Sequence, residues 1–73
     1  MSKQRTGHVL KFEDGRYYVE EQPYYTAKLD EAKIYNKYFD LMEAQAAALR
    51  LTGSPVSMVA VSFRICDIAE VVN

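Results

Sequence analysis

The 73-residue chain has few of the residues on which catalysis or covalent stabilisation usually depends. It holds one cysteine, so no internal disulfide can form, and one histidine, which together exclude an ordinary structural zinc site. Its three glycines, Gly7, Gly15 and Gly53, are too widely spaced for a phosphate-binding loop. Nothing in the sequence places a base beside Cys66 or a catalytic partner beside His8. We therefore expect no catalytic residue, no metal and no cofactor.

Charge and apolar runs are also modest. Nine basic residues stand against ten acidic ones, which argues against a non-specific nucleic-acid binder, because such a protein needs a concentrated basic field. The longest apolar stretches are too short to cross a bilayer. A single cysteine and an N-terminus without an apolar run predict a cytoplasmic location. The length predicts one domain, with residues 1–7 as a flexible lead-in and residues 8–73 as the domain.

The clearest structural signal is the dipeptide Asp14-Gly15, which lies between two short strand-like runs. Asp-Gly in a two-residue connection favours a type I′ turn, because that turn requires positive φ at both central positions. The predicted hairpin register then places Phe12 opposite Tyr17. Side chains alternate along a strand, so the hairpin would have one apolar face. That face would hold Leu10, Phe12, Tyr17 and Val19.

An alanine-rich run at residues 38–51 predicts a helix. Gly53 is a suitable C-terminal cap, and Asn36 or Asp40 is expected to be the N-cap. Helical periodicity indicates one broad apolar face. The residues expected on it are Tyr38, Leu41, Met42, Ala44, Ala48 and Leu49.

The remaining segments complete an α+β fold of order β-β-β-α-β. A third strand is predicted at residues 32–35 and a long strand at 56–65, while residues 24–26 form either a short edge strand or a loop. The expected structure is a small antiparallel sheet of three to four strands with one helix packed on one face. The other face would be open to water, with Val9, Lys11, Tyr18, Lys33, Tyr35 and Arg64 on it.

Six tyrosines raise the question of binding. Tyrosines on an open sheet face stack nucleic-acid bases, anchor protein interfaces, or simply cover a small sheet. Protein binding is our first hypothesis. The candidate contact residues come from the lead-in, the open face and the loop after the hairpin: Lys3, Arg5, Arg16, Tyr18, Tyr24, Tyr25 and Tyr35.

The pattern of residues 9–19, then 29–35, then an alanine-rich helix resembles small phage-encoded regulators of the Xanthomonas-phage type, which bind bacterial RNA polymerase. The resemblance implies a non-enzymatic protein that acts in the host bacterial cytoplasm. It implies docking on polymerase subunits, with inhibition of transcription initiation by occluding or displacing a factor. It also implies antitermination as an additional activity. We expect the protein to be a monomer.

Two other classes remain open. One is a small nucleic-acid-binding module that uses the open sheet face. The other is a structural or assembly protein that pairs with further chains through an exposed strand edge at residues 56–65.

Overall fold

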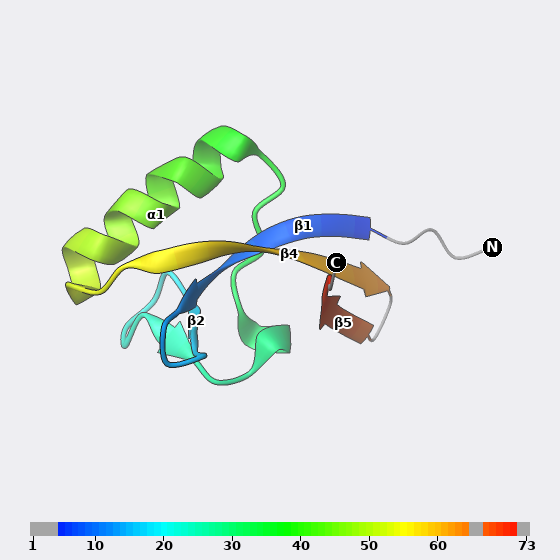
Figure 1. The fold of residues 1–73 in the computed structure, drawn as a ribbon, viewed down its shortest axis with the longest axis horizontal. Helices are drawn as coiled ribbons and strands as arrows, with labels where there is room; N and C mark the ends of the chain where they lie inside the picture. The colour runs from blue at the N-terminus through cyan, green and yellow to red at the C-terminus, as the bar shows by residue number, and fades with distance from the viewer. Residues whose placement is uncertain (1–4, 65–66, 72–73) are drawn as a thin grey trace.

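The computed structural model describes residues 5–64 and 67–71, which form five strands, one α-helix and one short 3-10 helix. All strands are antiparallel and make one sheet in the order β3-β2-β1-β4-β5 (Figure 1). The α+β class is confirmed, with more strands than predicted. In chain order the elements are β1 (Arg5–Phe12), β2 (Tyr17–Tyr18), β3 (Tyr25–Thr26), η1 (Leu29–Glu31), α1 (Tyr38–Thr52), β4 (Val56–Arg64) and β5 (Asp67–Glu70).

The centre of the sheet is the long pairing of β1 with β4, which runs from Arg5 opposite Phe63 to Phe12 opposite Val56. β1 therefore includes residues 5–7, which the sequence had assigned to the lead-in. β4 lies between β1, which pairs with residues 56–63, and β5, which pairs with residues 61–64. The free edge expected at residues 56–65 is therefore wrong for residues 61–63, which have a partner strand on both sides.

The hairpin register differs by one residue from the prediction, because Lys11 lies opposite Tyr17. The carbonyl of Phe12 accepts the N–H of Gly15 at 3.0 Å, and the N–H of Phe12 donates to the carbonyl of Arg16 at 2.7 Å. Three residues, 13–15, lie between the hydrogen-bonded Phe12 and Arg16, and among them only Gly15 has positive φ, at 94°. This is a type I turn followed by a glycine bulge, not the predicted type I′ turn.

The one-residue shift exchanges the faces of the two neighbouring tyrosines, because side-chain direction alternates along a strand. Tyr18 lies under α1, and Tyr17 lies on the opposite face. The core between α1 and the sheet consists of Leu10, Phe12, Tyr18, Tyr35, Leu41, Ala44, Ala48 and Val56.

The helix ends as predicted and begins differently. Gly53 is the left-handed C-cap with φ of 73°, and its N–H donates to the carbonyl of Leu49 at 2.8 Å. The N-cap is Lys37, without a side-chain cap hydrogen bond, so the prediction of Asn36 or Asp40 is wrong. The helix buries its small side chains, Ala44 and Ala48 with Leu41, because these let its backbone approach the sheet closely. The other residues predicted to be buried, Tyr38, Met42 and Leu49, are exposed.

The second sheet face is covered, which corrects the expectation of an open face. The sheet curls so that β5 contacts η1, and both lie across the sheet from α1 (Figure 1). Residues 32–35 are not a regular strand, although Tyr35 forms an isolated bridge with His8. The third strand is β3 instead. The core on this side contains Val9, Tyr17, Ala32 and Val61, with the partly buried Leu29, Ile34, Val59 and Ile68 around it.

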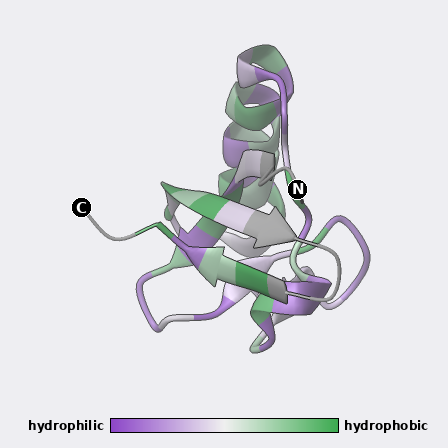
Figure 2. Cartoon of the chain, turned by 90° about the vertical axis from the view of Figure 1, so that its right-hand side faces the viewer, coloured by the Kyte–Doolittle hydropathy of each residue, from purple (hydrophilic) through white to green (hydrophobic). Residues whose placement is uncertain are grey.

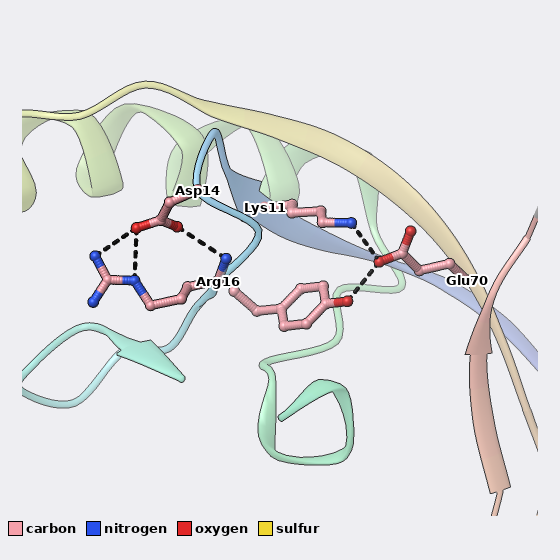
Figure 3. Close-up of polar contacts among 5 residues, drawn as sticks. Lys11, Asp14, Arg16 and Glu70 are labelled. Atoms are coloured by element: carbon pink, nitrogen blue, oxygen red, sulfur yellow. Dashed lines mark hydrogen bonds and ion pairs between the residues drawn. The ribbon is translucent and has the colours of Figure 1, made fainter. Parts of the chain in front are cut away.

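Glu70 joins the two sides of the curled sheet. Its Oε2 atom accepts a hydrogen bond of 2.5 Å from the Tyr17 hydroxyl and one of 2.9 Å from Lys11 Nζ (Figure 3). Because β1 and β4 separate β2 from β5 in the sheet, these side chains meet only when the sheet curls. The bonds from Tyr17 and then Lys11 lower the pKa of Glu70. The bond to Glu70 is also the main cause of the raised pKa of Tyr17.

Replacing Glu70 by glutamine is expected to lower the free energy of unfolding by about 1 kcal/mol at neutral pH, because a charged acceptor of two hydrogen bonds is lost. The pKa of Glu70 is lower in the folded protein, so its charge stabilises the fold above the unfolded value of about 4.5. This contribution disappears as the pH falls through the folded pKa. Urea unfolding of both proteins from neutral to acid pH should show converging stabilities, and a pH-independent difference would contradict this account.

Gly7 allows the segment after η1 to cross β1 closely. A Cβ atom at this position would lie 2.7 Å from Ile34 Cγ2 and 3.1 Å from Asn36 Oδ1. We expect Gly7→Ala to destabilise the protein by about 1–3 kcal/mol, as overpacking does. The cost should be smaller in an Ile34→Ala background, because that change removes the nearest atom. Strictly additive effects in chemical denaturation would show that the two positions do not touch.

Candidate protein-binding surfaces

A pocket lies at the end of the sheet where the hairpin turn, the loop before β3 and the C-terminus of α1 come together. We call it the hairpin pocket, and its volume is about 470 Å³. Three of the predicted contact residues, Arg16, Tyr24 and Tyr25, line it together. The remaining lining residues are Phe12, Glu13, Asp14, Pro23, Leu51, Thr52, Ser54 and Pro55.

Arg16 is held in place on the rim of this pocket. Its Nη2 and Nε atoms lie 2.6 Å and 2.7 Å from Asp14 Oδ2, and its backbone N–H donates to Asp14 Oδ1 at 3.0 Å (Figure 3). Its guanidinium group also lies 4.0 Å from the centre of the Tyr25 ring, a cation–π distance. The pair lowers the pKa of Asp14 and raises that of Arg16. The turn thus presents an arginine of defined orientation stacked on an aromatic ring.

The two tyrosines of the pocket differ in exposure. Tyr25 is 41% exposed, whereas Tyr24 is partly buried against the helix-side core. Tyr24 has φ of 70°, which is unusual for a residue with a side chain. Its N–H donates to the carbonyl of Glu21 at 2.7 Å, and its carbonyl accepts the N–H of Val19 at 3.3 Å. The backbone of this loop is therefore fixed by hydrogen bonds on both sides of the tyrosine.

Tyr18 and Tyr35, predicted as contact residues on an open face, are buried. Their exposed fractions are 3% and 5%, because both pack beneath α1. Burial is the largest cause of the raised pKa of each phenol. The Tyr35 hydroxyl donates to Glu20 Oε2 at 2.7 Å, so its polar atom has a partner. Both residues are core residues in this structure, and the expectation that they face solvent is wrong.

Of the two basic residues expected from the lead-in, one lies within the described part of the chain. Arg5 begins β1, where it pairs with Phe63 at the far end of the strand from the hairpin turn. Lys3 lies outside the described residues, as does Cys66. His8 lies in the middle of β1, between Ala60 of β4 and Tyr35.

A second surface, on the outer side of α1, was missed by the sequence analysis. Hydrophobic residues recur on successive turns of this helix (Figure 2). Phe39 is 70% exposed and Leu49 is 51% exposed, and Tyr38 and Met42 are exposed beside them. The sequence did contain a signal for this surface, because the helix has apolar residues on more than one side. Choosing which side is buried required knowing that the alanines pack on the sheet.

Comparison of the chain with models of protein families, with curated proteins and with solved structures gave no match. The described helices include none with the length and apolar character needed to span a membrane. Within residues 5–64 and 67–71, no cluster of three or more histidine, cysteine or acidic side chains is arranged to hold a metal ion. The site is therefore characterised by its geometry alone.

Proposed function

We propose that this chain is a non-enzymatic regulator that binds a host protein complex through the hairpin pocket. The observation that carries the proposal is the convergence of Arg16, Tyr24 and Tyr25 on one pocket. Tyrosine and arginine are enriched among the residues that dominate binding energy in protein interfaces. Their preorganisation reduces the entropy lost on binding, because the Arg16 side chain is already held by Asp14 and Tyr25.

The proposed target is bacterial RNA polymerase, on the basis of the resemblance to small phage regulators. In this proposal the chain occupies a polymerase surface that another factor needs, and initiation is inhibited without any covalent change. Antitermination is an additional activity of the same complex. The proposed place of action is the host bacterial cytoplasm.

The alternative of nucleic-acid binding is weakened by the covered sheet face. That alternative needed exposed aromatic side chains on the face opposite α1. Tyr17 lies on that face, but it is buried and its hydroxyl is bonded to Glu70. The described residues therefore provide no stacking platform there.

Tyr25→Ala and Arg16→Ala are each expected to weaken binding to purified bacterial RNA polymerase by about thirtyfold, the effect of losing about 2 kcal/mol at a central contact. Both side chains are exposed, so the fold should be retained. Lys28→Ala is the matched control, because Lys28 is an exposed basic residue outside the hairpin pocket. Immobilised chain, with core polymerase and holoenzyme as analytes, gives the affinities.

An initiation assay with the same variants links binding to function. Loss of inhibition should follow loss of affinity. Binding by the wild type that both pocket variants retain would show that another surface makes the contact. Absence of binding to either form of the polymerase would show that the target is wrong.

A further inference from the structure

The exposed side of α1 carries a stripe of apolar residues that are not part of the helix-side core. We define the α1 stripe as Phe39, Met42, Ala46 and Leu49, which are spaced by three, four and three residues. All four are exposed, and this spacing places them along one side of a helix. The same spacing is found where two helices pack along a common seam. The stripe is distinct from the hairpin pocket, since Leu51, the helix residue that lines the pocket, projects from the opposite side of the helix axis.

Two charges of opposite sign flank the stripe along one edge. Glu43 and Arg50 are seven residues apart, a rise of about 10.5 Å, which is too far for a direct pair within the helix. Ion pairs within a helix form between residues three or four positions apart. Between Glu43 and Arg50 those positions are Ala46 and Ala47, which carry no charge. The ion pairs of the described residues are Lys11–Glu70 and Arg16–Asp14, and they do not include Glu43 or Arg50.

This charge arrangement is self-complementary. When two identical helices pack antiparallel about a two-fold axis, the same edge of each helix faces its copy. With the axis near Ala46, Glu43 of one copy lies beside Arg50 of the other, and the pair occurs twice. The small side chain of Ala46 lies at the crossing point and permits close approach. Met42 of one helix then packs near Leu49 of its copy.

We propose that the occupant of the α1 stripe is a second copy of this chain, bound as an antiparallel, two-fold symmetric dimer. A second copy supplies an apolar surface that covers the stripe. It also supplies an opposite charge for both Glu43 and Arg50. This dimer differs from the monomer that the sequence led us to expect. It uses a different surface from the proposed function, so the hairpin pocket remains free in both copies.

Sedimentation velocity of the full chain, from low micromolar to millimolar concentration, tests the proposal. The wild type should show a concentration-dependent monomer–dimer equilibrium. Leu49→Gln should weaken the dimer by at least about tenfold, because it places an amide in the seam. Leu51→Gln is the matched control: Leu51 is a similarly exposed leucine on the same helix, 46% against 51% for Leu49. It should leave the dimer unchanged. Circular dichroism confirms that each variant folds.

Charge reversal identifies the partner as a second copy. Glu43→Arg and Arg50→Glu should each weaken the dimer by about tenfold, because each creates two like-charge contacts across the seam. The double variant should recover the wild-type affinity, since its pairs are restored with exchanged signs. A wild type that stays monomeric at every concentration, or a double variant that fails to recover, overturns the proposal. Loss of polymerase binding by Leu49→Gln in a monomeric chain would assign the stripe to the polymerase instead.

Discussion

The arrangement of this fold depends on the hydrogen bonds that Glu70 accepts from Tyr17 and Lys11. They connect β5, at one edge of the sheet, to β1 at its centre and to β2 beyond β1. The curl that brings them together covers the second sheet face and buries Val9 and Val61 beneath it. In a chain of 73 residues, α1 alone covers one face, so the second core depends on this closure. The hairpin end and the outer side of α1 remain exposed.

The hairpin register decides whether this closure can form. A three-residue turn with Gly15 as its bulge sets Lys11 opposite Tyr17, and both then point to the side where Glu70 lies. The type I′ turn would have placed Tyr17 beneath the helix and Tyr18 on the face of Glu70. Both turns suit the Asp-Gly dipeptide, because each has positive φ at the position of Gly15, where glycine is favoured. Local sequence therefore predicts the hairpin but leaves its register to tertiary packing.

The difference between local sequence signals and tertiary packing also explains which other predictions were confirmed. The α+β class, the helix end at Gly53 and the long strand β4 follow from local capping and periodicity. The closure of the curled sheet does not, because the hydrogen bonds to Glu70 join residues separated by more than fifty positions. The buried side of α1 could not be narrowed locally either. Its predicted apolar face combined Leu41, Ala44 and Ala48, which are buried, with Tyr38, Met42 and Leu49, which are exposed. Tyr35 is buried beneath α1, whereas the predicted strand at residues 32–35 had placed it on an open face. Arg16, Tyr24 and Tyr25 were identified from residue type, and the structure adds that they line one pocket.

Determining which face of the sheet Tyr17 occupies is the most direct test of this account. The result depends both on the hairpin register and on the closure by β5. Nuclear Overhauser contacts from the Tyr17 ring protons, measured in the labelled full chain, distinguish the two faces of the sheet. Contacts to Ile68 and Glu70 of β5 are expected, with Tyr18 showing contacts to Leu41 and Ala44 of α1 instead. Contacts from Tyr17 to α1, with none to β5, would contradict both the register and the covered second face.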